Sequence, residues 1–85
     1  MIYKVFTIYD SKSEIYLQPQ YCKTKNECLR IFTDIVNSSD SQNQVAKHPE
    51  DYTLFEIGEY DDSTGSFSML SASISLGNAL EYKNQ

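Results

Sequence analysis

With 85 residues and a formal net charge of −5, the chain is one small domain whose acidity argues against general binding to nucleic-acid phosphates. Its two cysteines, one histidine and three glycines without Gly-x-Gly spacing argue against a four-ligand zinc site and a glycine-rich phosphate loop. No stretch approaches the roughly 20 apolar residues of a membrane span, and residues 1–9 do not resemble a secretory signal. The sequence predicts a non-enzymatic domain without metal or cofactor, with reduced cysteines and a cytoplasmic location.

The distribution of charge and the number of tyrosines both bear on whether the chain associates with other molecules. Residues 1–33 carry a net charge of +2 and the remainder carries −7. This asymmetry permits head-to-tail contact between subunits or one mildly basic face, but two ordinary solvated surfaces are the simpler explanation. The seven tyrosines are a composition typical of protein interfaces, so a homodimer is expected.

Two strands are expected at the start of the chain. Residues 2–9 are β-branched and aromatic, which predicts a strand buried on both faces. A turn at residues 10–13 leads to a second strand over residues 14–21. Pro19 confines that strand to an edge or ends it, because proline lacks the amide donor of a sheet ladder.

An amphipathic helix follows. Thr24 precedes Glu27 by three residues, which is the spacing of a capping box. Apolar residues then recur at helical spacing, and a polar Asn-Ser-Ser segment ends the pattern. The apolar residues of this stripe are Cys28, Ile31, Phe32 and Ile35.

A hairpin dominates the second half. Residues 38–48 are expected to form a mobile loop with one short helical turn around Val45. Residues 52–60 form the first strand of the hairpin, Gly65 supplies a positive φ to its loop, and Asp62 bonds the backbone ahead of it. Later apolar residues can add a final strand or turn, and residues 81–85 are expected to fray.

These elements predict an α+β fold in a single domain spanning residues 1–85. One amphipathic helix packs on a small antiparallel sheet of three to five strands, with a prominent hairpin in the C-terminal half.

Catalytic and metal chemistry find little support. His48 precedes Pro49 and has no partner identifiable in the sequence, so it is interpreted as a turn residue. The paired carboxylates Glu50-Asp51 and Asp61-Asp62 lack the alternate spacing and the distal Glu of a calcium loop.

One binding pattern remains in the N-terminal third, where tyrosines and lysines interleave. Aromatic side chains on a sheet, flanked by lysines, can stack bases and hold the phosphates of single-stranded nucleic acid. The alternative is that these tyrosines are ordinary strand residues and the lysines keep sheet edges soluble. The residues of this candidate nucleic-acid or partner face are Tyr3, Lys4, Tyr9, Lys12, Tyr16, Tyr21, Lys23 and Lys25.

Three segments, VFTIYDSKSEIYLQP, ECLRIFTDIVN and KHPEDYTLFEIGEYDDSTGSF, resemble the small nonstructural protein of gokushoviruses, single-stranded-DNA phages of the Microviridae. The resemblance covers roughly residues 5–67. Its motifs are a D-S-K turn, an R-x-F helix, H-P-E-D and G-x-[FY]-D-x-x-T-G. Here we interpret the motif residues, together with the capping box, as positions that maintain the fold: Thr24, Glu27, Arg30, Phe32, His48, Pro49, Asp51, Gly58, Asp61 and Gly65.

The resemblance implies an accessory protein in the host cytoplasm, acting in viral DNA replication at the switch to single-strand synthesis and packaging. It would bind a phage or host replication or packaging protein. Direct binding of single-stranded DNA is the first alternative, and a scaffolding role in the procapsid is the second.

Overall fold

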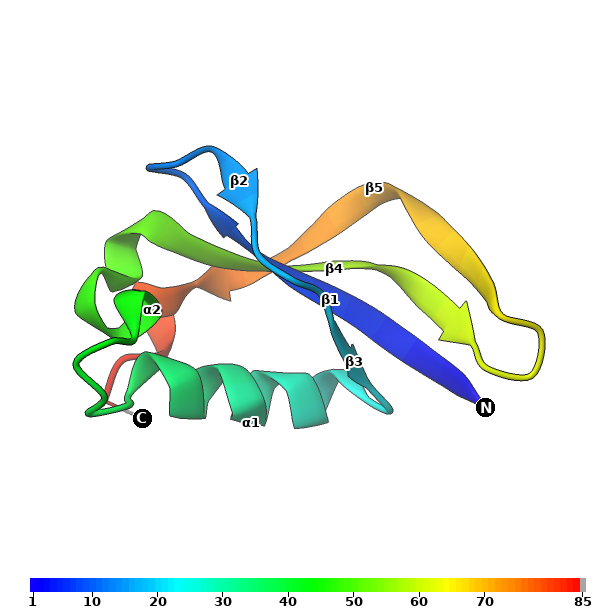
Figure 1. The fold of residues 1–85 in the computed structure, drawn as a ribbon, viewed down its shortest axis with the longest axis horizontal. Coiled ribbons are helices and arrows are strands. Elements are labelled where there is room, and N and C mark those ends of the chain that lie inside the picture. Colours follow the sequence, from blue (N-terminus) through cyan, green and yellow to red (C-terminus); the bar gives the residue numbers. More distant parts are fainter. Residues whose placement is uncertain (85) are drawn as a thin grey trace.

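The computed structural model describes residues 1–84 as two layers, an antiparallel sheet and one main helix packed across it (Figure 1). The predicted α+β class is therefore confirmed, with five strands in one sheet. The helix covers only part of the sheet, and the tip of the C-terminal hairpin extends beyond it (Figure 1).

Strand β1 (Ile2–Asp10) is the centre of the sheet. On one side it pairs with β4 (Tyr52–Asp61), which in turn pairs with β5 (Ser66–Asn78). On its other side β1 pairs with two short strands, β2 (Ile15–Tyr16) and β3 (Gln20–Cys22). The strand expected over residues 14–21 is thus divided, because Pro19 interrupts the ladder between the two pieces.

Helix α1 (Lys25–Val36) begins as the sequence predicts. The Glu27 amide donates to Thr24 Oγ1 at 3.1 Å, and the Lys23 amide donates to Glu27 Oε1 at 3.2 Å. The side chains of Cys28, Phe32 and Val36 face the sheet and are buried, whereas Ile31 is exposed. Arg30 is also exposed on the helix. The main core comprises Phe6, Ile8, Cys22, Cys28, Phe32, Val36, Val45, Tyr52, Leu54 and Ala79.

Both cysteines are free and belong to this core. Burial raises the pKa of the Cys28 thiol to about 12, and burial likewise raises the pKa of the Cys22 thiol. Thiols with such pKa values react poorly at neutral pH, because the thiolate is the reactive form.

The hairpin turn follows the prediction in position but not in its bonding. Asp61, and not Asp62, organises it, since Asp61 Oδ1 accepts from the Ser63 amide at 2.9 Å and from Ser63 Oγ at 2.7 Å. The Gly65 amide donates to the Asp61 carbonyl at 2.8 Å, with Gly65 at a φ of 70°. Asp62 instead pairs with the amino group of Met1.

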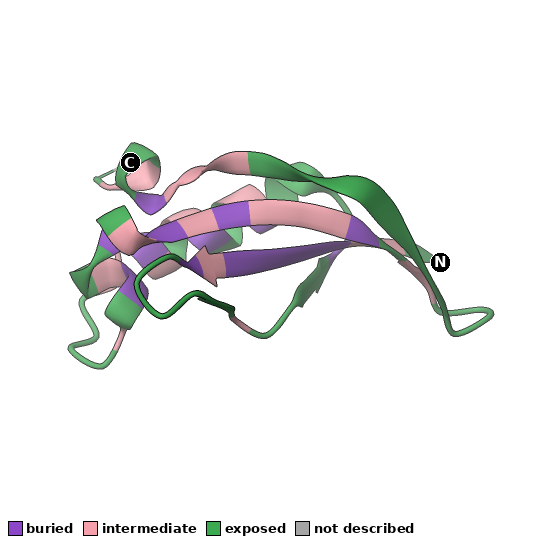
Figure 2. Ribbon diagram, turned by 90° about the horizontal axis from the view of Figure 1, so that it is seen from above, coloured by how far each residue is buried: buried purple, intermediate pink, exposed green. Residues whose placement is uncertain are grey.

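The ladder between β4 and β5 is interrupted near its middle. Glu56 pairs with Ile74 and Gly58 pairs with Met69, so Ile57 is the single residue of β4 opposite the four residues 70–73 of β5. Figure 1 shows β5 bent away from β4 along this stretch. Residues 66–75 of β5 are all exposed (Figure 2).

The segment before β4 and the chain after β5 are both ordered around the core. Helix α2 (Gln44–Lys47) is the short turn expected near Val45, and a 3-10 turn, Pro49–Asp51, follows it. A second 3-10 turn spans Ala79–Tyr82. Lys83 Nζ donates to the carbonyls of Val36 and Ala46 at 3.0 and 3.2 Å.

The expected fraying of residues 81–85 is therefore not found over residues 81–84. Asn37 Nδ2 donates to the Tyr82 carbonyl at 2.9 Å, and the Tyr82 ring packs edge-on against Phe32. The sequence pattern could not indicate these bonds, because each joins the tail to a distant helix end. Residue 85 lies outside the described residues.

Candidate partner-binding face

The sheet has an open face, opposite α1, on which aromatic side chains gather. Side chains alternate between the two faces of a strand, and Phe6 and Ile8 of β1 point into the core beneath the helix. Tyr3, Val5, Thr7 and Tyr9 therefore point to the other side. Val5 is 2% exposed although it lies outside the main core, so this face buries apolar surface of its own.

The first aromatic group on the open face joins three strands. Tyr21 of β3 and Tyr60 of β4 have ring centroids 5.9 Å apart, although β1 runs between their strands. Phe67 of β5 lies 4.8 Å from Tyr60 and 6.4 Å from Tyr21. Rings at these spacings and tilts stabilise one another by about 0.5–1.5 kcal/mol per pair beyond their burial.

The second aromatic group lies near the other end of β1. The ring centroids of Tyr9 and Tyr16 are 4.7 Å apart, and those of Tyr16 and Phe55 are 6.4 Å apart. Tyr16 is 58% exposed, so much of its ring remains available for contact with another molecule.

A mainly apolar hollow of about 370 Å³ lies on the same side of the sheet. Thr7 and Ile57 come from the two central strands, while one wall is formed by β2 and the segment that follows it. The bent part of β5 forms the opposite wall. The remaining lining residues are Tyr16, Leu17, Pro19, Met69, Leu70 and Ser73.

The lysines of the predicted face lie elsewhere. Lys4 points to the helix side of the sheet, where its Nζ lies 3.7 Å from Glu56 and 3.9 Å from Glu59. Lys12 lies in the turn between β1 and β2, and Lys23 and Lys25 flank the start of α1. The structure thus brings Tyr3, Tyr9, Tyr16 and Tyr21 together on one face and separates them from these four lysines.

The open face carries no charge on its strands. The register and the strand alternation place every charged strand residue on the helix side, within residues 1–84, which the structure describes. The aromatic groups and the hollow are therefore surrounded by Thr, Ser and apolar side chains. Those charged residues are Lys4, Asp10, Glu56, Glu59 and Asp61.

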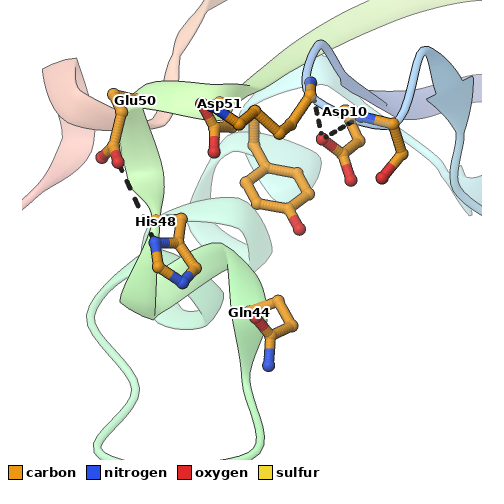
Figure 3. Close-up of a pocket in the computed structure, with 8 residues that line it drawn as sticks. Asp10, Gln44, His48, Glu50 and Asp51 are labelled. Atoms are coloured by element: carbon orange, nitrogen blue, oxygen red, sulfur yellow. Dashed lines mark hydrogen bonds and ion pairs between the residues drawn. The ribbon is translucent and has the colours of Figure 1, made fainter.

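A second, polar pocket of about 490 Å³ lies between the β1–β2 turn and residues 48–51, which we call the H-P-E-D segment (Figure 3). The Ser11 amide and Oγ donate to the Asp51 carbonyl at 2.9 and 3.1 Å, which ties the two segments together. Asp10 Oδ1 accepts from the amides of Lys12 and Ser13 at 3.0 and 3.3 Å. Asp51 thus contributes to the fold through its backbone.

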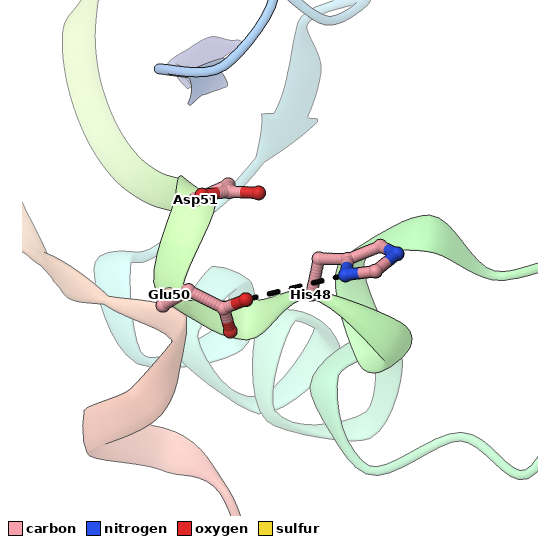
Figure 4. A group of neighbouring side chains, drawn as sticks. All are labelled: His48, Glu50 and Asp51. Atoms are coloured by element: carbon pink, nitrogen blue, oxygen red, sulfur yellow. Dashed lines mark ion pairs between the residues drawn. The ribbon is translucent and has the colours of Figure 1, made fainter.

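The H-P-E-D segment also places a histidine beside two carboxylates (Figure 4). His48 Nδ1 lies 4.0 Å from Glu50 Oε1, and ligand atoms of these two residues and Asp51 all lie within 4.8 Å of one another. His48 and Glu50 are more than half exposed, and three ligand atoms on one exposed turn fall short of the closed four-ligand set of a structural metal site. We therefore assign no metal to this cluster.

Asp10, which lines this pocket, makes the stability of the protein depend on pH. Burial alone would raise the pKa of this carboxyl, but hydrogen bonds from Ser13 and Lys12, with a smaller one from Tyr52, hold the pKa below its ordinary value of 3.8. A carboxyl whose pKa is lower in the folded state than in the unfolded state stabilises the fold at pH values above the unfolded-state pKa. This stabilisation is lost as the pH falls from the unfolded-state pKa through the folded-state pKa.

We expect Asp10→Asn to lower stability at neutral pH and to reduce its decline between neutral pH and pH values below 3.8. Urea unfolding at several pH values measures both effects. Ser13→Ala, which removes one donor, should give a smaller change of the same kind. An unchanged acid dependence in Asp10→Asn would contradict this assignment.

Comparison with known proteins identifies the family. The model of the family described as Phage ORF5 protein matches residues 3–82. Protein ORF5 of Chlamydia phage 1, a gokushovirus of the Microviridae, is 35% identical over 71 residues, covering 81% of this chain and 74% of that protein. No solved structure matches. Among residues 1–84, no helix has the length and hydropathy needed to span a membrane. The resemblance expected from the motifs is confirmed, and the chain belongs to the Phage ORF5 protein family.

Proposed function

We propose that this protein is a non-enzymatic phage accessory protein that binds a replication or packaging protein through the open aromatic face of its sheet. We infer a role at the switch to single-strand synthesis and packaging from the family resemblance alone. The observation that carries the binding mode is the uncharged strand surface, with its two aromatic groups and an apolar hollow between β2 and β5.

Such a surface suits a protein partner. The core of a protein interface is depleted in charge and enriched in aromatic residues and methionine, and anchoring side chains enter desolvated pockets. Phe67 and Met69 are 53% and 58% exposed, so both retain area that a partner can cover. The hollow beside them has the size and lining to receive an aliphatic or aromatic anchor from that partner.

Replacing Phe67 by serine should weaken binding to the partner by about tenfold or more, since truncating a central aromatic anchor costs over 1 kcal/mol. The measurement is titration of each protein of the same phage against the purified accessory protein. Leu80→Ser is the matched control, because Leu80 is 55% exposed but lies outside the sheet. Equal binding by both variants, or no binding by any phage or host replication or packaging protein, would overturn the proposal.

Direct binding of single-stranded DNA is the alternative, favoured by the aromatic groups on an open sheet, which resemble a base-stacking platform. It has less support, because a cationic groove normally accompanies such a platform and the four N-terminal lysines lie away from this one.

Fluorescence anisotropy of a labelled oligonucleotide at two salt concentrations separates the alternatives. We expect a flat titration. Saturable binding that weakens steeply with salt would favour the DNA reading, and its loss in Lys4→Glu and Lys23→Glu would assign the phosphate contacts. Cosedimentation with procapsids tests the scaffolding alternative.

A further inference from the structure

Strand β5 is a long free edge of the sheet. The opposite edge is formed by β2 and β3, whereas β5, which is 13 residues long, pairs only with β4. Residues 66–75 are all exposed, and residues 70–73 have no register partners on β4 (Figure 2). An edge of this kind presents backbone N–H and C=O groups to any further strand.

The edge lacks most of the usual protections against such pairing, and the bend at residues 70–73 is the one that is present. Natural edge strands are blunted by charged residues, by proline, by β-bulges or by a covering element. Residues 63–80 contain no charged residue and no proline, although the whole chain carries a net charge of −5. The bend at residues 70–73 displaces the strand but leaves it exposed.

We propose that β5 is a homodimer interface, in which two copies pair antiparallel about a two-fold axis at Ser71. An acidic protein repels its own copy, so a contact surface free of charge favours self-association, and β5 supplies one. A strand paired with itself about a two-fold axis forms an isologous contact that closes at two copies. This interface shares side chains of β5 such as Phe67 and Met69 with the open face, but the backbone pairing at the edge does not depend on the proposed function.

The sequence of β5 fits that axis. With Ser71 opposite its own copy, each larger side chain opposes a small one: Phe67 faces Ser75, Met69 faces Ser73, and Leu70 faces Ala72. Moving the axis by one residue in either direction places Leu70 against its own copy or against Ile74. The joined sheets would also carry the two open faces on one continuous surface.

A disulfide at the axis tests the geometry. Residues directly opposite in an antiparallel pair have Cβ atoms about 4.5–5.5 Å apart, so Ser71→Cys should form an intermolecular disulfide under mild oxidation with modest adjustment. Cys22 and Cys28 are buried and should not compete. Ser63→Cys, exposed at the hairpin tip, is the matched control and should cross-link poorly. Equal cross-linking of the two variants, or none in Ser71→Cys, would overturn the proposal.

Sedimentation equilibrium supplies an independent measurement. The unmodified protein should be a dimer, and Ser71→Lys should raise its dissociation constant by about tenfold or more, since two lysines on the axis repel each other. Ser63→Lys should remain a dimer, and circular dichroism should show both variants folded. The proposal is overturned if the unmodified protein is a monomer, and the edge would then be free for a strand of another protein. It is also overturned if Ser71→Lys dimerises as tightly as the unmodified protein.

Discussion

Replacing Phe32 by alanine should lower the free energy of unfolding by about 3–5 kcal/mol, as is typical of a large aromatic side chain removed from a core. Phe32 is 2% exposed, and its ring lies 5.3 Å from that of Tyr82, so the loss would loosen both the helix and the C-terminal turn. A domain of this size has a stability of only about 4–13 kcal/mol. At the lower end of that range, the loss leaves a large unfolded fraction.

Urea unfolding followed by far-UV circular dichroism measures this loss. Ile31→Ala is the matched control, because Ile31 precedes Phe32 on the same helix but is 39% exposed. The control should lose about 1 kcal/mol or less, as surface-type truncations do. Similar losses in both variants would contradict the placement of the helix on the sheet.

Replacing Gly58 by valine should destabilise the protein by about 3 kcal/mol, the upper part of the range for overpacked sites. A Cβ atom at Gly58 would lie 2.7 Å from the Ser68 carbonyl oxygen and 3.0 Å from Met69 Cα. Both atoms belong to the backbone of β5, so β4 and β5 would have to separate. The same separation would displace Met69 from the hollow on the open face.

Gly65 supplies the comparison for this prediction. Gly65 has a left-handed backbone conformation, with a φ of +70°, which Gly58 does not have. In contrast to Gly58, no atom lies within 4 Å of a Cβ built at Gly65. Asparagine tolerates this left-handed region, so Gly65→Asn should lose about 1 kcal/mol or less in the same unfolding measurement. If Gly58→Val unfolded at the same urea concentration as Gly65→Asn, the close approach of the two strands would be wrong.

Local patterns predicted the helix and the hairpin because their determinants lie close together in the sequence. Thr24 and Glu27 mark the helix start, and the spacing of Cys28 and Phe32 identifies its buried side. The hairpin loop was placed correctly through Gly65. The choice of Asp62 over Asp61 failed because two adjacent carboxylates are equivalent in sequence and differ only in where the turn directs them.

The sequence correctly indicated that the tyrosines of the candidate face lie on one side of the sheet, but it wrongly placed the lysines beside them. Lys4 is adjacent to Tyr3 in the sequence, but neighbours in a strand point to opposite faces, and here the ion pairs with Glu56 and Glu59 fix Lys4 on the helix side. Tyr60 and Phe67 complete the aromatic group from distant strands, and only the register reveals it. The length of β5 was missed because eight of its 13 residues are Ser, Ala, Gly or Asn, which give a weak strand signal even though larger apolar residues lie between them.

The pairing of β1 with β4 has a consequence for synthesis of the chain. Ile2 pairs with Asp61 and Asp10 pairs with Tyr52, so the central strand leaves the ribosome well before its main partner exists. At typical rates of about 5–20 residues per second, the edge of β1 that receives β4 stays unpaired for several seconds, whereas β2 and β3 follow β1 directly on its other side. The neighbouring β4–β5 hairpin, in contrast, can close soon after its own residues emerge, since it joins segments close in sequence. The contact between β1 and β4, which joins the two locally paired parts of the sheet, should therefore form late.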